Sequence, residues 1–236
     1  MKKFAVFDID GTLIRWQLYH AVVDKLAKQG LLGEKAHQQL HDARMVWKRR
    51  EHREAFHAYE KELITVYEHA LPNIGEEQFM YCVRAVADEY KTQVYTFTRD
   101  LAKKLKQQNY TLIAISGSHR EIVEPVARQY GFDIFLGTEY ERRNGRFTGK
   151  VKIGSKDKHI KLKQLINTHN LDTKGSYGVG DSKSDASMLE LVDNPIAFNP
   201  DRELFAIAQD HSWPIVIERK NMVYRLERED GRYVLA

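Results

Sequence analysis

The stretch FAVFDIDGTLI, residues 4–14, decides the fold of this chain. Its apolar run from Phe4 to Phe7 leads directly into two carboxylates, Asp8 and Asp10, that are separated by one residue. An unbroken apolar run of this kind is typical of a strand that is buried on both faces, as in a parallel sheet covered by helices. A pair of carboxylates at the end of such a strand indicates that a cationic or reactive group lies beside it, because unpaired buried charges are costly.

Downstream of Thr98, the chain alternates between helical and strand-like segments. Strands are predicted at residues 110–116, 132–137, 176–181, 194–199 and 213–217, with helical segments between most of them. The pair Asn144-Gly145 predicts a β-hairpin after the second of these strands. Alternation at these lengths predicts the α/β class, with a Rossmann-like, doubly wound parallel sheet. The charged tail, residues 218–236, has no pattern that predicts its structure.

A long helical segment separates the first strand from this alternating region. From about Arg15 to Tyr90, apolar residues recur three and four positions apart, and no strand pattern interrupts them. We therefore predict a core made of residues 1–14 and 92–236. A helical cap, residues 15–91, is inserted after the first strand.

The composition predicts an ordinary soluble globular protein. The chain has 236 residues, of which 42% are hydrophobic, and this is enough to bury a large core. Its longest apolar runs are far shorter than the roughly 20 residues that a membrane-spanning helix needs. The first residues, MKKFAVFDID, reach carboxylates too soon for a signal peptide. We therefore expect a cytoplasmic protein with no membrane span.

The charge of the chain is a weak indication of its partners. A formal net charge of +4 arises from 37 basic and 33 acidic residues, and the two signs are interleaved over most of the chain. A nucleic-acid-binding protein usually carries a basic patch together with a recognisable reading element. We therefore expect no nucleic acid partner, whereas small anionic molecules are compatible with this charge.

Cysteine and histidine do not form a predicted zinc site. Cys82 is the single cysteine, so it has no partner for an internal disulfide, and we expect it to be packed on a helix. Six of the ten histidines fall in the predicted cap, including His37 and His41, which are one helical turn apart. Without an acid or a cysteine at ligand spacing, we expect these histidines to be surface residues.

Chemically capable residues stand where the predicted strands end. In an open parallel sheet, ligands gather at the carboxyl ends of the strands. The residues found there, or at the start of a following helix, are Asp8, Asp10 and Thr12, then Ser116, Gly117 and Ser118, then Lys158, and finally Asp181 and Asp185.

These groups meet the requirements of phosphoryl transfer. Magnesium prefers hard oxygen ligands, and these could come from Asp8, from Asp181 and from the carbonyl oxygen of Asp10. A carboxylate that attacks phosphorus forms an aspartyl phosphate and splits hydrolysis into two steps. Ser116, the neighbouring backbone N–H groups and Lys158 could bind the phosphoryl oxygens. Asp10 could protonate the leaving oxygen and later deprotonate water.

Each of these residues also has a simpler interpretation. A D-x-D pair alone also fits a solvated turn or a nucleotide-sugar transferase motif. Ser118 fits the N-cap of the next helix better than a substrate ligand. Asp185 fits a first-turn acid stabilised by the helix dipole. Lys156 and Lys161 are rivals of Lys158, which is preferred because apolar residues follow it at helical spacing.

Four ordered motifs resemble those of the haloacid dehalogenase (HAD) superfamily. They are DIDGTL at residue 8, ISGS at residue 115, KDKHIKL at residue 156 and GDSKSD at residue 180. The resemblance is greatest to the phosphoserine phosphatase-like branch (subfamily IB), in which a helical cap follows the first motif. It implies the following roles: Asp8 as nucleophile, Asp10 as general acid and base, Ser116 and Gly117 as phosphate ligands, Lys158 as a ligand of both phosphate and nucleophile, Asp181 as a magnesium ligand, and Asp185 as an anchor of the metal's water shell.

The resemblance implies a Mg²⁺-dependent phosphatase that acts on a small phosphorylated metabolite. In phosphoserine phosphatases, a glutamate nine residues after the nucleophile helps to hold the substrate's ammonium, and here that position is Gln17. Trp16 and Tyr19 fit a substrate pocket and cap packing equally well. Two alternatives stay open: a phosphotransferase that uses the same intermediate, and a non-catalytic binding protein on the same fold.

Overall fold

The computed structural model describes residues 2–153, 157–229 and 231–235. Its strands are β1 (Lys2–Phe7), β2 (Thr111–His119), β3 (Ile134–Arg143), β4 (Arg146–Ile153), β5 (Leu171–Gly180), β6 (Asn194–Phe198), β7 (Ile215–Arg219), β8 (Met222–Glu229) and β9 (Arg232–Leu235). Its helices are α1 (Leu18–Lys28), α2 (Glu34–Lys48), α3 (Ala55–Ala70), the short 3₁₀ helix η1 (Leu71–Asn73), α4 (Glu76–Tyr90), α5 (Thr96–Gln107), α6 (Arg120–Gln129), α7 (Lys158–His169), α8 (Lys183–Leu189) and α9 (Arg202–His211).

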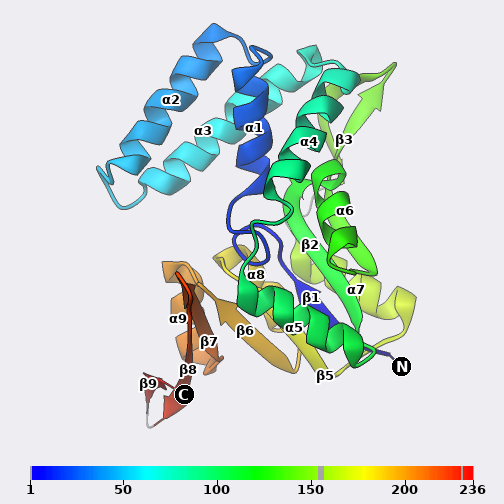
Figure 1. Ribbon diagram of the computed structural model, residues 1–236, viewed down its shortest axis with the longest axis vertical. Helices are drawn as coiled ribbons and strands as arrows, with labels where there is room; N and C mark the ends of the chain where they lie inside the picture. Colours follow the sequence, from blue (N-terminus) through cyan, green and yellow to red (C-terminus); the bar gives the residue numbers. More distant parts are fainter. Residues whose placement is uncertain (1, 154–156, 230, 236) are drawn as a thin grey trace.

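The described strands form a nine-stranded sheet in the order β4-β3-β2-β1-β5-β6-β7-β8-β9 (Figure 1). The strands from β3 to β7 in this order are parallel, and antiparallel strands extend the sheet at both edges. The chain moves outward from β1 through β2 and β3, and then returns to β5 on the other side of β1. The predicted doubly wound fold is confirmed, and its switch point lies beside β1, where such sheets bind ligands.

Helices cover both faces of this sheet. On one face, Ala5 and Phe7 of β1 belong to a hydrophobic cluster that includes α5 and α6. On the other face, Phe4 and Val6 belong to a cluster that includes α7, α8 and α9. All four of these side chains have 0% exposure. The apolar run at the start of the chain is therefore unbroken because both faces of β1 are buried.

The helical segment between β1 and α5 gathers at one end of the sheet (Figure 1). Helices α1 to α4 and η1 lie within the predicted cap, residues 15–91. The chain enters and leaves this segment side by side, because the N–H of Arg15 donates to Gln93 (2.8 Å) and the N–H of Tyr95 donates to Leu13 (3.0 Å). The division into a core and a cap domain stays a prediction.

The predicted hairpin at Asn144-Gly145 is confirmed and carries β3 and β4 towards the helical segment. Both turn residues have positive φ, 52° and 72°, as a two-residue hairpin turn requires. The hydroxyl of Tyr140 donates to Glu68 of α3 (3.0 Å), and the ring of Phe147 packs on an α4 phenylalanine. The hairpin therefore supports the helices of this segment from one side.

The tail, which gave no prediction from the sequence, forms strands β8 and β9. They continue the sheet in antiparallel register from β7, with Leu226 opposite Leu235. Most of the side chains on both strands are exposed. A strand that is exposed on both faces has no buried face to impose a hydrophobic period, and this is why its pattern was missed.

Two expectations about single residues are confirmed and one is wrong. Cys82 is buried on α4, and His37 and His41 are exposed. His20, expected at the surface, is instead buried among aromatic rings of the helical segment, because it lies on the inward face of α1. Within the described residues, the structure contains no helix that is both long and apolar enough to span a membrane.

Candidate active site

The chain turns sharply after Asp8 and brings the end of β1 against the end of β5. Gly11 has a positive φ of 81°, and its N–H donates to the carbonyl oxygens of Ile14 (3.0 Å) and Trp16 (3.2 Å). A Cβ atom on Gly11 would lie 2.1 Å from Oδ2 of Asp181. Glycine is therefore required here both by the backbone conformation and by the close approach of this carboxylate.

Lys158, the first residue of α7, is the cation at the centre of the site. Its Nζ lies 2.6 Å from Oδ1 of Asp8 and 2.5 Å from Oδ1 of Asp185, and all three side chains are buried. Burial alone would lower the pKa of this ammonium, but the carboxylates of Asp185 and Asp8 outweigh burial and raise its pKa. Of its predicted rivals, Lys161 is partly buried on α7 and Lys156 lies outside the described residues.

Asp185 is a first-turn acid of α8, as one of its two predicted roles requires, and its role as an anchor of the metal's water shell stays a prediction. It stands in the first turn of α8, where its Oδ2 accepts hydrogen bonds from the N–H groups of Asp181 (3.0 Å) and Ser182 (3.1 Å). Its other oxygen, Oδ1, faces Lys158. One oxygen therefore caps the helix, and the other oxygen contributes charge to the site.

The carboxylates of the site outnumber its ammonium. Oxygen atoms of Asp8, Asp181 and Asp185 lie within 4.8 Å of one another. Burial raises the pKa of Asp8 to about 8, although the nearby Lys158 lowers it. Burial and the charges of Asp8 and Asp185 also raise the pKa of Asp181 well above its ordinary value. Burial first, and then the surplus of negative charge among the described side chains, therefore raise the pKa of both carboxyls.

This arrangement fits a divalent cation that prefers oxygen ligands. Oδ2 of Asp8 is buried and has no hydrogen-bond partner among the described residues. Asp8 and Asp181, predicted as magnesium ligands, are brought together, and Asp185 lies beside them. The side chain of Asp10 is hydrogen-bonded elsewhere, and the metal contact expected of its carbonyl oxygen stays a prediction. Carboxylate and carbonyl oxygens are the ligands that magnesium prefers.

The carboxylate of Asp10 points towards β2. Its Oδ1 accepts from the N–H of Leu18 (2.5 Å) and from the hydroxyl of Ser118 (3.0 Å), and its Oδ2 accepts from the hydroxyl of Ser116. Burial raises the pKa of Asp10, and these hydrogen bonds partly offset that rise. Asp8 and Asp10, two residues apart, thus occupy different environments, since Asp8 faces the Lys158 ammonium and Asp10 faces N–H and hydroxyl donors.

Ser118 is the residue that the sequence prediction placed wrongly. The N-cap of α6 is His119, and the Ser118 hydroxyl bonds Asp10 instead of the helix. Ser116 and Ser118 are two residues apart on β2, so both side chains lie on the same face of the strand. This spacing was the signal that could have identified Ser118. Gly117, between them, is exposed, and its phosphate-binding role stays a prediction.

Three residues that follow the turn at Gly11 lie near the candidate site or pack on the helical segment: Trp16, Gln17 and Tyr19. Gln17 is partly exposed, and its Nε2 would lie 3.3 Å from a Cβ on Gly11, so the amide stands close to the site. The ring of Trp16 lies 6.1 Å from that of Trp47, and the ring of Tyr19 lies 5.3 Å from that of Tyr67. Trp16 therefore packs within the helical segment, Tyr19 packs on that segment and also on His119 of β2, and a contact of either ring with substrate stays untested.

A family model of haloacid dehalogenase-like hydrolases matches residues 5–190, which is most of the chain. The chain belongs to this family. The match contains Asp8, Ser116, Lys158 and Asp185, and it confirms the resemblance of the four motifs.

Curated relatives and solved structures agree with this membership. A histidinol-phosphatase from Neisseria meningitidis is 28% identical over 232 residues, and the alignment covers 92% of this chain and 99% of that protein. A phosphoserine phosphatase from Archaeoglobus fulgidus is 24% identical, and the chain covers 58% of its length. A Bordetella pertussis protein of unknown function shares the fold with a TM-score of 0.74 at 22% identity, covering 92% of this chain and 99% of that one. An apo phosphoserine phosphatase also shares the fold, with a TM-score of 0.64 at 18% identity, and the match covers 93% of this chain and 94% of that one.

Replacing Lys158 with methionine is expected to destabilise the metal-free protein by about 3–5 kcal/mol, because the buried carboxylate of Asp185 would lose its counterion and Asp8 would lose the donor to its Oδ1. Chemical denaturation in the presence of a chelator measures the change. Lys183→Met is the matched control, since it breaks an exposed ion pair with Glu203 and is expected to leave the stability unchanged. A Lys158→Met protein as stable as the control would show that Lys158 does not balance these carboxylates.

Proposed function

We propose that this chain is a Mg²⁺-dependent phosphatase that hydrolyses a small phosphomonoester through an aspartyl phosphate on Asp8. The observation that carries the proposal is the buried contact of Asp8 with Lys158, beside Asp181 and Asp185. Together these groups supply a fixed carboxylate, a cation for phosphate and oxygen ligands for a metal. Family membership and phosphatase-named relatives identify the reaction class as phosphoric monoester hydrolysis.

The first half of the reaction transfers the phosphoryl group to Asp8. Lys158 holds Oδ1 of Asp8, so the carboxylate is oriented before the substrate arrives. The N–H of Gly117 and the Lys158 ammonium bind the phosphoryl oxygens, and the Ser116 hydroxyl joins them by turning from Asp10 to the phosphate when the ester binds. Bound magnesium supplies additional positive charge that stabilises the transferring phosphoryl group. Asp10 donates a proton to the leaving oxygen as the bond to phosphorus breaks.

The second half of the reaction hydrolyses the aspartyl phosphate. Asp10, now a carboxylate, accepts a proton from the attacking water, and phosphate leaves Asp8. The acid and base roles suit a group that is buried but held by three donors, from Leu18, Ser116 and Ser118. The helical segment 15–91 would act as a cap that excludes bulk water from the intermediate.

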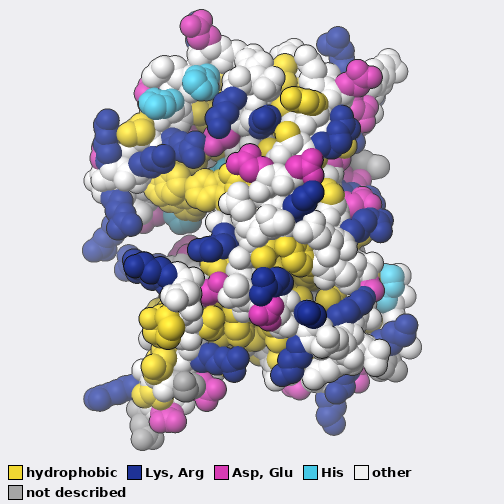
Figure 2. Space-filling model, viewed as in Figure 1, with side chains coloured by type: hydrophobic (Ala, Val, Ile, Leu, Met, Phe, Trp, Pro, Cys, Tyr) yellow, Lys and Arg dark blue, Asp and Glu magenta, His cyan; other side chains and the backbone are white. Residues whose placement is uncertain are grey.

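The proposed substrate is a small phosphorylated metabolite. Figure 2 shows that the molecule is hollowed between the helical segment and the carboxyl-terminal strands, with hydrophobic side chains on one wall and Lys and Arg side chains at both rims. Positive charge at the entrance attracts an anionic phosphate ester. The relatives named for histidinol phosphate and phosphoserine suggest these two esters as first candidates.

The proposed function is tested by a phosphate-release screen. Wild-type protein is incubated with Mg²⁺ and a panel of phosphomonoesters that includes histidinol phosphate, phosphoserine, sugar phosphates and p-nitrophenyl phosphate. Hydrolysis of at least one ester, with loss of activity on chelation, is the expected result. Transfer of phosphate to an added alcohol in place of water would assign a phosphotransferase. Absence of turnover on every ester would favour a binding protein.

The Gln17→Glu variant is expected to raise kcat/KM for phosphoserine about tenfold relative to an ester without an ammonium group. The added carboxylate would stand close to the site and pair with the substrate's ammonium, and a hydrogen bond to a charged group contributes about 1.5–3 kcal/mol. Initial rates on phosphoserine and on a sugar phosphate measure the ratio. Gln209→Glu adds the same charge on an exposed part of α9 and serves as control. An unchanged ratio would place Gln17 outside the substrate's reach.

A further inference from the structure

Two hydrogen-bond donors from distant parts of the chain meet on one oxygen of Asp10. The N–H of Leu18, at the start of α1, lies 2.5 Å from Oδ1, and the hydroxyl of Ser118, near the end of β2, lies 3.0 Å from the same atom. The first donor belongs to the helical segment that follows the catalytic loop, and the second belongs to the sheet. The orientation of the Asp10 carboxylate therefore depends on how these two segments are held together.

The chain neighbours of the two donors stack on each other. Tyr19 follows Leu18, His119 follows Ser118, and their rings lie 6.0 Å apart with an interplanar angle of 15°. Together with the chain bonds, these contacts form a closed circuit: Asp10 to Leu18, Leu18 to Tyr19, Tyr19 to His119, His119 to Ser118, and Ser118 back to Asp10. In this circuit, the stack of Tyr19 on His119 is the contact that joins α1 directly to β2 through side chains.

The imidazole of His119 is held from several directions. It is 1% exposed and also stacks on Tyr140 of β3, at 4.7 Å. Its Nε2 lies 2.6 Å from the hydroxyl of Tyr67 on α3, and its Nδ1 lies 3.7 Å from Glu121. Glu121 is in turn bonded to Arg142. A ring anchored in this way can act as a rigid support for Tyr19.

We propose that Tyr19 and His119 are positioning residues that hold the two donors of Asp10 in place. The proposal rests on the proposed function, because it assigns the stack to the proton-transfer step of that reaction. When the stack is removed, the start of α1 and the end of β2 lose a direct contact, so the two donors can shift relative to each other and the direction of the Asp10 carboxylate is less firmly fixed. A displacement of about 1 Å at a reacting group can cost on the order of 10²-fold in rate.

A comparison of kcat/KM for two aryl phosphates of similar shape tests the proton-transfer step separately from the other steps. Phenolate is strongly basic, since phenols such as tyrosine lose their proton near pH 10, so phenyl phosphate needs an acid to assist its departure. The p-nitrophenolate ion is a good leaving group without a proton. The values of kcat/KM for the two esters, which report on the step that forms the aspartyl phosphate, therefore respond differently to a misplaced Asp10.

The test compares His119→Leu, Tyr19→Leu and the double variant with wild type. For each single variant, we expect kcat/KM to fall about tenfold or more on phenyl phosphate and to stay within about threefold on p-nitrophenyl phosphate. We expect the double variant to lose little more than either single variant, because both changes break the same contact. Asp10→Asn gives the largest change in the ratio of the two esters. If His119→Leu does not fold, Tyr19→Leu, at a partly buried ring, carries the test alone.

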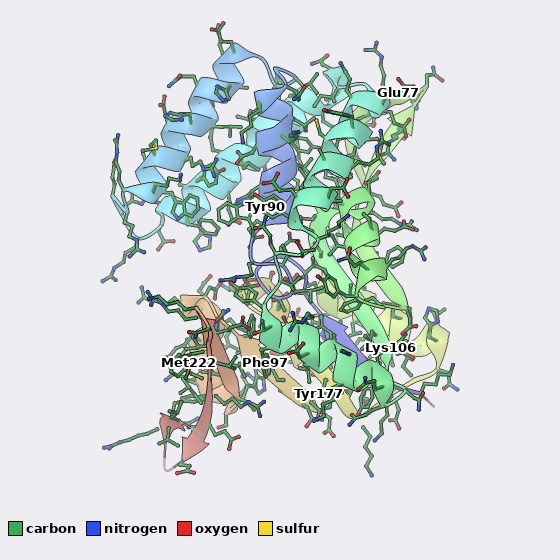
Figure 3. All side chains as sticks on the ribbon, in the orientation of Figure 1. Glu77, Tyr90, Phe97, Lys106, Tyr177 and Met222 are labelled. Carbon is green, nitrogen blue, oxygen red and sulfur yellow. The ribbon has the colours of Figure 1, made fainter. Side chains whose placement is uncertain are left out.

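The control is Phe97→Leu. Phe97, labelled in Figure 3, stacks on Phe198 at 5.8 Å and 9°, beside the carboxyl-terminal strands, so its loss removes a similar contact elsewhere. We expect it to leave the ratio of the two esters unchanged. Equal losses on both esters in the Tyr19 and His119 variants, or no loss, would overturn the positioning role. A wild type that hydrolyses neither these two esters nor any other ester of the panel would overturn the proposed function itself.

Discussion

Asp8→Asn is expected to lower phosphate release by about 10⁴-fold or more on any ester that the wild type hydrolyses. An amide of the same size has no negative oxygen with which to attack phosphorus, so the aspartyl phosphate cannot form. Lys158 would keep its contact with Asp185, and the surrounding loop would keep its shape. Initial rates at saturating substrate and Mg²⁺, for both proteins, measure the loss.

A stability measurement on the Asp8→Asn variant tests whether its loss of activity is caused by unfolding. In the metal-free protein, the pKa of Asp8 is about 8, above its value of about 4 in an unfolded chain. At a pH between these two pKa values, Asp8 has lost its proton in the unfolded chain but keeps it in the folded chain. The Asp8 carboxyl therefore lowers the stability of the folded protein as the pH rises through this range. Asp8→Asn removes the effect. With chelator present, the variant is therefore expected to gain stability relative to wild type from pH 5 to pH 8.

Asp88→Asn is the matched control for the activity measurement, because Asp88 is exposed on α4 and pairs with a surface lysine. It is expected to retain the wild-type rate. An Asp8→Asn protein that kept the wild-type rate would show that Asp8 is not the nucleophile, and the proposed mechanism would then be wrong.

Removal of divalent metal is expected to abolish activity, and Mg²⁺ is expected to restore it. Oxygen atoms of Asp8, Asp181 and Asp185 lie within 4.8 Å of one another with one ammonium among them, so the phosphoryl group would meet net negative charge without a cation. Dialysis against a chelator, followed by titration with Mg²⁺ during turnover, measures the requirement. Full activity after dialysis would contradict it.

A binding measurement separates this requirement from catalysis. Mg²⁺ at about 100 times its dissociation constant is expected to stabilise the wild type by about 2.7 kcal/mol. Asp181→Asn is expected to lose most of this gain, because the variant replaces a carboxylate that faces Asp8 with a neutral amide. Asp88→Asn is expected to keep the gain. Equal stabilisation of the Asp181 and Asp88 variants by Mg²⁺ would place the metal elsewhere.

Much of the fold could be predicted because its elements have local signals. β1 is an unbroken apolar run since both of its faces are buried, and Asn144-Gly145 supplies the positive φ angles that a two-residue hairpin needs. Strands β8 and β9 could not be predicted in this way. Their register depends on pairing with β7 and not on a buried face of their own.

The sequence was enough to predict the parallel part of the sheet, the helical segment, Asp8 and Asp10 at a strand end and Lys158 at a helix start. Their types and order are local properties, and the carboxyl ends of parallel strands must meet at one edge. Only the tertiary structure decided that Ser118 bonds Asp10 and that His119 stacks on Tyr19. These contacts join residues about a hundred positions apart, and no periodicity within either segment encodes which residue of the other segment it will meet.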